Sequence, residues 1–253
     1  MTNLVMRHDV DILMLVECII PASVILQALN PQGNAQYYFA PVGYEKIVIY
    51  TKFSPKFLQP VLDADRFTIR LLKLPGLTEI LLAVTHLQSK LYWSDEDQFE
   101  ECRKLSDAVG KAEKQVQHAR TVLIGDLNMN PFEDGLVSAS MLNAVMTRQI
   151  ALRGSRTVAG NKYPFFYNPM WSHFGDGNES PPGTYYYAGS GYRTLFWNIF
   201  DQVLIRPDLI DLFQNETLKI LSTDGNVSFL SKRGLPDQSV ASDHLPILFK
   251  LNL

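Results

Sequence analysis

The sequence is poor in cysteine and contains no apolar run long enough to cross a membrane. Its 253 residues include two cysteines, Cys18 and Cys102, and neither lies in the spacing of a metal site. We expect both to be reduced residues of the core, as is usual in the cytosol. The most apolar stretch, residues 12–20, is interrupted by Glu17 and falls far short of the ~20 residues of a membrane-spanning helix.

The first residues also lack the basic and then apolar order of a signal peptide. The sequence contains no repeat, no low-complexity tract and no linker-like change of composition. These absences exclude a disulfide framework, a zinc-ligand cluster and a membrane-spanning protein. The sequence predicts a single cytoplasmic domain, residues 1–253, with no membrane contact and no obligate protein partner.

An excess of positive charge is missing as well. The net charge of −3 excludes a broadly basic surface, so a polyanion would have to meet a local patch. Residues 135–175 offer one, because they include no acid but several cations followed by aromatics: Arg148, Arg153, Arg156 and Lys162, then Tyr163, Phe165, Phe166, Tyr167 and Trp171. We expect Arg153 and Arg156 to contact a phosphate-bearing substrate, although a solvated helix followed by a core-packing loop would explain the segment equally well.

The hydrophobic pattern predicts many short strands and one long amphipathic helix that begins at Ser94. The hydrophobic content of 46% is ample for a core. The strands are expected at residues 10–16, 36–40, 46–52, 67–74, 79–85, 122–124, 183–187, 195–206 and 247–249.

Acids and amides stand directly after one of these buried strands, in the run Gly125-Asp126-Leu127-Asn128. A carboxylate at the end of a core strand is costly unless it is paired, hydrogen-bonded or bound to a cation. Asp126 and Asn128 share one side of an extended chain, because side chains alternate with a period of two. An Asx-type turn after a strand would explain these two residues without any function.

Other strands end in the same way. Glu17 follows the strand at residues 10–16, His86 follows that at residues 79–85, and Asp243-His244 precedes the last strand. Asp201 lies inside the apolar run Phe200 to Ile205. A surface acid past a strand and a structural histidine are the alternatives for Glu17 and His86, but several such residues together indicate one shared site.

GDLN at residues 125–128 and SDHLPI at residues 242–247, in that order, resemble motifs of the endonuclease/exonuclease/phosphatase superfamily. DILMLVE at residues 11–17 and VTHL at residues 84–87 are similar to two further blocks of that superfamily. The resemblance covers nearly the whole chain. It implies an α/β (α+β) fold, a four-layer sandwich of two mixed, mainly antiparallel sheets with outer helices.

The resemblance also implies roles for these residues. Glu17, together with Asp243, is expected to bind a metal ion, and their oxygen atoms suit Mg²⁺ or Mn²⁺ rather than zinc. Asp126 is expected to position or deprotonate the attacking water, and Asn128 to hold the phosphate or that water. The remaining expected residues are His244, which is oriented by Asp201 and faces the phosphate, and His86, a second phosphate-facing histidine for which Glu45 is the matching orienting acid.

One part of the superfamily pattern is missing from this sequence. Members open with a strand that ends in an Asn, upstream of the block seen here at Asp11, but Asn3 lies in a helical context. We therefore expect the first strand to be absent and metal binding to be weakened. We also expect the gap to be closed, either by the flanking strands moving together or by strand complementation from another chain.

The function predicted from these residues is divalent-metal-dependent hydrolysis of phosphoester bonds, most simply by a nuclease acting on DNA. One alternative is a phosphatase or phosphodiesterase for inositol-phosphate, lipid or other small phosphoesters. Another is a non-catalytic relative that binds a phosphorylated ligand. Retention of both histidines and of all four acids favours the enzyme, because a binding module does not need the whole set.

Overall fold

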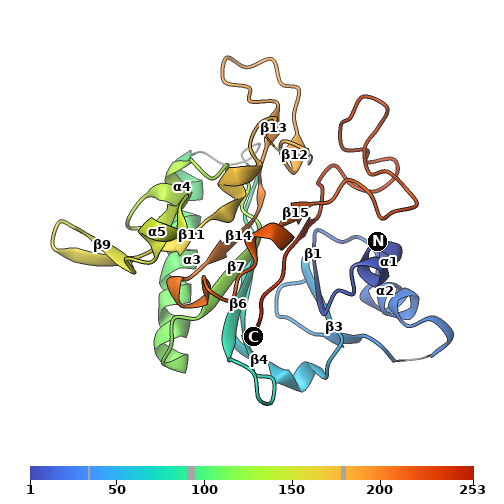
Figure 1. Ribbon diagram of the computed structural model, residues 1–253, viewed down its shortest axis with the longest axis horizontal. Helices are drawn as coiled ribbons and strands as arrows, with labels where there is room; N and C mark the ends of the chain where they lie inside the picture. Colours follow the sequence, from blue (N-terminus) through green and yellow to red (C-terminus); the bar gives the residue numbers. More distant parts are fainter. Residues whose placement is uncertain (34, 90–94, 178–180) are drawn as a thin grey trace.

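The computed structural model describes residues 1–33, 35–89, 95–177 and 181–253. Its elements form four layers, which follow one another across Figure 1. Two short helices, α1 (Thr2–Arg7) and α2 (Ala22–Leu29), cover a small sheet, which packs on a large sheet covered in turn by the long helix α3 (Asp95–Val116). This is the predicted sandwich, and the predicted start of α3 at Ser94 lies outside the described residues.

The small sheet is antiparallel, in the order β1 (Ile12–Val16), β3 (Ile47–Thr51) and β2 (Tyr38–Ala40). Its apolar side chains join α1, α2 and the facing side of the large sheet in one core. Val16 lies opposite Ile47, and the N–H of Glu17 donates to the carbonyl of Lys46. Glu17 and Lys46 are therefore held together at one end of this sheet.

The large sheet has seven strands and contains most of the predicted site. Their order is β4 (Leu58–Ala64), β5 (Phe67–Leu72), β6 (Ile80–His86), β7 (Thr121–Asp126), β14 (Asp201–Ile205), β11 (Phe166–Tyr167) and β8 (Ala144–Val145). β6 and β7 are parallel, because α3 connects them across the outer face of the sheet. β14 runs antiparallel to β7, so its first residue lies beside the last residue of β7.

The second core lies between the large sheet and α3. Cys102, Leu105, Val109 and Ala112 form the buried stripe of the helix that its periodicity predicts. Cys102 is a free, buried cysteine, as expected, and burial raises the pKa of its thiol to about 12. Cys18, in the loop after β1, is also free, and it packs half-buried against the core between the two sheets.

The remaining elements are short. Three two-stranded ribbons lie outside the main sheets: β9 (Ser155–Val158) with β10 (Asn161–Pro164), β12 (Tyr185–Tyr186) with β13 (Trp197–Asn198), and β15 (Lys219–Ile220) with β16 (Ile247–Leu248). The short helices are α4 (Asp134–Val137), α5 (Arg148–Ala151), η1 (Pro31–Gly33), η2 (Pro55–Phe57), η3 (Pro169–His173), η4 (Pro207–Leu209) and η5 (Asn215–Thr217). In the part of the chain that the structure describes, no helix has both the length and the apolar character that crossing a bilayer requires.

The two strands that would lie on either side of the expected first strand do not pair with each other. Among the described residues, β1 pairs only with β3, and β16 pairs with β15 in a separate ribbon. The expected movement of the flanking strands into one sheet is therefore not seen. Both strands still border the same core, through residues such as Met14 and Ile247.

Candidate active site

Three adjacent strands of the large sheet place their polar residues in one row. The register pairs His86 at the end of β6 with Asp126 at the end of β7, and Asp126 with Asp201 at the start of β14. Directly paired residues on neighbouring strands lie side by side on one face. The row therefore brings together three of the residues that the sequence predicts to share a site.

Gly125 allows β6 and β7 to approach closely just before this row. Its φ of 141° is in a region that favours glycine, and an added Cβ would lie 1.9 Å from the carbonyl oxygen of Thr85. That oxygen belongs to the backbone of β6 and cannot move aside independently. The glycine is therefore required where Asp126 is placed beside His86.

Asp126 is buried, and it accepts hydrogen bonds from uncharged groups of Asn128. Its Oδ1 accepts from the backbone N–H of Asn128 at 2.8 Å, and its Oδ2 accepts from Asn128 Nδ2 at 2.9 Å. Burial first, and then the neighbouring carboxylate of Asp201, raise the pKa of Asp126 to about 7. A cation bound at this position would offset both effects.

Asn128 holds Asp126 in place. Its backbone is in the left-handed region, with φ 49°, which Asn tolerates better than most residues. Its Nδ2 donates both to Asp126 and to the carbonyl of Leu87 at 2.8 Å, which uses both N–H groups of the amide. In this arrangement Asn128 has only its carbonyl oxygen left, so it can accept a hydrogen bond from water but cannot donate one to a phosphate.

His244 contacts Asp201, the acid that the sequence pairs with it. Its Nδ1 lies 2.8 Å from Asp201 Oδ2. Burial alone would lower the pKa of His244, but the adjacent Asp201 carboxylate, with Asp126 and Asp243 nearby, raises it to about 9. A backbone bridge between Tyr185 and His244 fixes this segment next to the ribbon β12–β13.

The small sheet contributes Glu17 from the opposite side. Glu17 Oε1 lies 3.3 Å from His86 Nε2, and Lys46 Nζ lies 3.7 Å from the same oxygen. Glu17 has φ 53°, a conformation that costs a non-glycine residue roughly 1–2 kcal/mol and recurs at functional sites. Burial lowers the pKa of His86 despite the nearby Glu17 carboxylate, with Lys46 and Arg66 acting in the same direction as burial.

The donor set fits a divalent cation with oxygen ligands. Asp126, Asp201 and His244 offer ligand atoms that lie within 4.8 Å of one another. Carboxylate oxygens are the preferred ligands of hard divalent ions such as Mg²⁺ and Mn²⁺. Asp243 is next to His244 in the chain, and its Oδ1 lies 3.4 Å from the Oγ of Ser242.

Three predicted residues are not brought to this row. Glu45 is exposed before β3, and the residue of the small sheet that contacts His86 is Glu17 instead. The Nδ1 of His86 is buried without a hydrogen-bond partner in the described part of the chain. Arg153 and Arg156 precede β11, whose Tyr167 pairs with Ile205, the last residue of β14, whereas Asp201 is the first residue of that strand. Arg156 donates to the carbonyl of Val137 at 2.7 Å.

Lys46, Arg66 and Tyr185 lie at the site but were not predicted. Lys46 and Arg66 both depress the pKa of His86, and the Tyr185 ring lies 4.7 Å from that of His244. Lys46 stands directly before an apolar strand in the sequence, just as Glu17 and Asp126 stand directly after one. This position at the end of a strand could have identified Lys46 as a candidate site residue.

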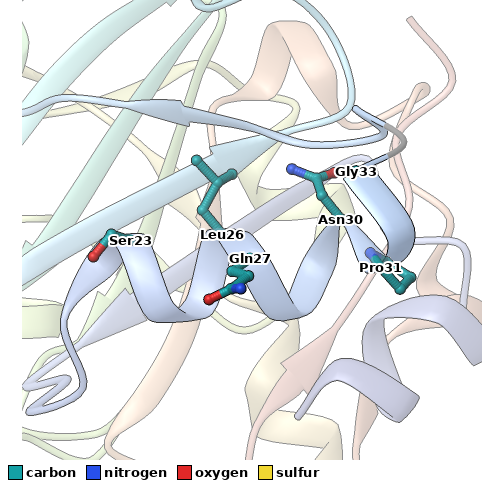
Figure 2. A pocket seen from close by; sticks show the side chains of 6 residues that line it. All are labelled: Ser23, Leu26, Gln27, Asn30, Pro31 and Gly33. Carbon is teal, nitrogen blue, oxygen red and sulfur yellow. The ribbon is translucent and has the colours of Figure 1, made fainter.

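A pocket of about 690 Å³ lies elsewhere, along α2, and is lined by Ser23, Leu26, Gln27, Asn30, Pro31 and Gly33. Figure 2 shows these side chains along the helix and the turn that follows it. The polar groups of Asn30 are already engaged, because Nδ2 donates to Tyr37 and Oδ1 accepts from Gln36 and Tyr37. The lining contains no titratable side chain. The candidate for acid–base or metal chemistry is therefore the row of residues at the ends of β6, β7 and β14.

Comparison with known proteins agrees with this geometry. The family model described as the Endonuclease/Exonuclease/phosphatase family matches residues 1–244. A comparison with curated protein sequences found no match.

Among solved structures, the chain is similar to the endonuclease domain of TRAS1, a telomere-specific non-LTR retrotransposon, with 13% identity, a TM-score of 0.54, and coverage of 99% of this chain and 91% of that one. It is also similar to ANGEL2, a 2′,3′-cyclic phosphatase, with 16% identity, a TM-score of 0.59, and coverage of 98% and 83%. A third is a variant of NExo, a 3′ phosphatase from Neisseria, bound to a product DNA hairpin, with 16% identity, a TM-score of 0.50, and coverage of 99% and 92%. At these identities the likeness shows the fold, and it confirms the predicted sandwich.

Proposed function

Because this chain belongs to the endonuclease/exonuclease/phosphatase family, most of whose members are metal-dependent phosphoester hydrolases, we propose that it is a Mg²⁺- or Mn²⁺-dependent phosphodiesterase that cleaves nucleic acid, with DNA as the preferred substrate. The observation that carries this proposal is the row His86–Asp126–Asp201 with Glu17 and His244 beside it. Phosphoester hydrolysis needs groups that orient water, groups that face the phosphoryl oxygens and a cation, and this row supplies candidates for each.

Each residue has a proposed role. Asp126, held by Asn128, orients the attacking water and accepts its proton. His244, with Nδ1 bound to Asp201, uses its other ring nitrogen to bind or protonate the phosphate. His86 faces the phosphate from the other side of Asp126, and Glu17 and Asp243 would hold the cation beside Asp126 and Asp201. When bound, that cation would polarise the phosphate and stabilise the leaving oxygen.

Nucleic acid is the proposed substrate class for two reasons. Two of the structural relatives are described as an endonuclease domain and as an enzyme bound to a DNA hairpin. Lys46 and Arg66 also provide positive charge beside His86, where a polyanionic backbone would pass. Arg153 and Arg156, on the far side of the sheet, would contact only a long substrate that wraps around the molecule.

Hydrolysis should be tested on plasmid DNA, single-stranded DNA, RNA, 2′,3′-cyclic nucleotides, inositol phosphates and a phospholipid, each with Mg²⁺, with Mn²⁺ and with excess chelator. We expect metal-dependent cleavage of nucleic acid that stops in chelator. Cleavage confined to a small phosphoester would change the proposed substrate. No cleavage of any substrate would leave the binding of a phosphorylated ligand as the function of the site.

A further inference from the structure

A column of aromatic rings leads away from His244 along the ribbon β12–β13. The Tyr185 ring lies 4.7 Å from the His244 ring and stacks on Phe200 at 5.3 Å with an interplanar angle of 23°. Tyr187 follows two residues later, so it lies on the same face of the strand as Tyr185, about 6.5 Å further from His244. Tyr187 therefore follows directly along the ribbon from the rings that contact the proposed phosphate-binding histidine.

Tyr187 is fixed in position although it is half-exposed, with 50% of its surface accessible. Its N–H donates to the carbonyl of Phe196 at 2.8 Å, which extends the ribbon by one pair. Gly189 lies against the ring, because a Cβ there would be 2.3 Å from Tyr187 Cε1. The surface of this ring is therefore held ready for a partner.

The opposite face of the ribbon supports this arrangement. Tyr186 stacks on Phe196 at 6.3 Å and meets Trp197 edge-on at 5.4 Å. These rings brace the ribbon, so the aromatic surface of Tyr187 faces solvent without being needed for the core. An exposed aromatic ring two residues along the strand from a ring that contacts His244 is placed where it could stack on a base of a bound nucleic acid.

We propose that Tyr187 stacks on the nucleobase of a nucleotide adjoining the scissile phosphate, with Tyr185 between that base and His244. This inference rests on the proposed nucleic-acid substrate and adds how the substrate is gripped. The step from Tyr185 to Tyr187 is comparable to the reach from a phosphate to the base of an adjoining nucleotide. Inside a duplex both faces of a base already stack on neighbouring bases, so we expect a preference for single-stranded or frayed ends.

The test compares two single-stranded oligonucleotides of equal length and charge, one of deoxythymidines and one of abasic tetrahydrofuran units. Tyr187→Ala should weaken binding of the first by about tenfold, as expected for the loss of one base–aromatic stack, and leave the second unchanged. Tyr187→Phe, which retains the ring, should bind both like the parent. Tyr38→Ala is the matched control, because Tyr38 is an exposed tyrosine of β2 opposite Thr51, at the end of β3 distant from Lys46.

Binding is measured by fluorescence anisotropy in chelator, and cleavage separately with Mg²⁺. Base-dependent binding lost in Tyr187→Ala supports the inference even if nothing is cleaved, in which case only the proposed nuclease activity fails. Equal losses on both oligonucleotides would show that Tyr187 is merely structural. Unchanged binding in Tyr187→Ala, or no binding by the parent protein, would overturn the inference.

Discussion

Asp126 is a buried carboxylate that lies directly across a strand pair from a second carboxylate, Asp201. Its ordinary pKa of 3.8 is raised to about 7 in the folded protein without metal. An acid whose pKa is raised on folding favours the folded state while it is protonated, and this contribution is lost as the pH rises from about 4 to about 7. The pKa of His244 is raised from 6.5 to about 9, so its contribution to stability is lost as the pH rises through that range.

Asp126→Asn should therefore flatten the pH dependence of stability between pH 4.5 and pH 7. The amide keeps the size of the side chain but has no charge to bury. The free energy of unfolding is measured by urea titration in chelator, where the structure without metal applies. Asp208→Asn, at an exposed acid of η4, is the control and should keep the slope of the parent. A parallel slope in Asp126→Asn would show that the carboxylate is not destabilised by burial.

Asp201 acts through His244, because Nδ1 of His244 contacts the Asp201 carboxylate. We expect His244→Ala to lower kcat by about 10²-fold or more, the usual scale for a positioned acid or phosphate donor. Asp201→Asn should lower kcat by a smaller factor, because the amide can still orient the ring but cannot stabilise its charge. Combined with His244→Ala, it should cause no additional loss. Additive losses would show that Asp201 acts independently of His244.

At the scale of the strand, β7 depends on Gly125 for its position against β6. In Gly125→Ala, the new Cβ would collide with the carbonyl oxygen of Thr85. The φ of residue 125 also lies in a region that alanine adopts only with strain. We expect a loss of roughly 2 kcal/mol or more in unfolding free energy, together with a fall in kcat as Asp126 moves away from His86. Gly110→Ala in α3, where a Cβ would meet no atom within 4 Å, should be neutral or stabilising. If both variants have the same melting temperature, the close approach of the two strands is unimportant.

Elements whose pattern is local could be predicted from the sequence. The strand at residues 79–85 is observed as Ile80–His86, and the long helix as Asp95–Val116. β4 was not predicted, because Pro60 interrupts its strand pattern. The structure tolerates this proline because β4 is an edge strand of the large sheet and has a bulge at this point. The expected single strand at residues 195–206 is interrupted at Ile199 and Phe200, whose N–H groups donate to Asn130 and Thr184.

The candidate site was predictable to the extent that each residue ends a strand. His86 and Asp126 follow from that rule, and parallel pairing of β6 with β7 aligns them. Asp201 instead drew attention as an acid inside an apolar run, and it begins β14, whose antiparallel pairing with β7 places it beside Asp126. Sequence patterns could not show which residue of the small sheet reaches His86, because that depends on how the two sheets pack. Glu17 is the residue that does, and Glu45 is not.

At the scale of the whole molecule, the site lies where the two sheets meet. The small sheet supplies Glu17, and the large sheet supplies Asp126 and Asp201. Carboxylates gathered from two layers repel one another at neutral pH, which opposes packing of the layers. A divalent cation bound by both layers would replace that repulsion by attraction, so metal binding and sheet packing should be coupled.

This coupling predicts that Mg²⁺ or Mn²⁺ raises the melting temperature relative to chelator. A ligand that binds only the folded state stabilises it by about 2.7 kcal/mol at a concentration of 100 Kd, or roughly 5–10 °C for a domain of this size. The shift is measured by differential scanning calorimetry over a metal titration. Glu17→Gln removes the charge that the small sheet contributes, and it should abolish most of the shift while raising the melting temperature in chelator. Glu45→Gln is the matched control, because Glu45 is an exposed acid of the same sheet end and should leave the shift intact. A full metal-induced shift in Glu17→Gln would mean that the cation is held by the large sheet alone.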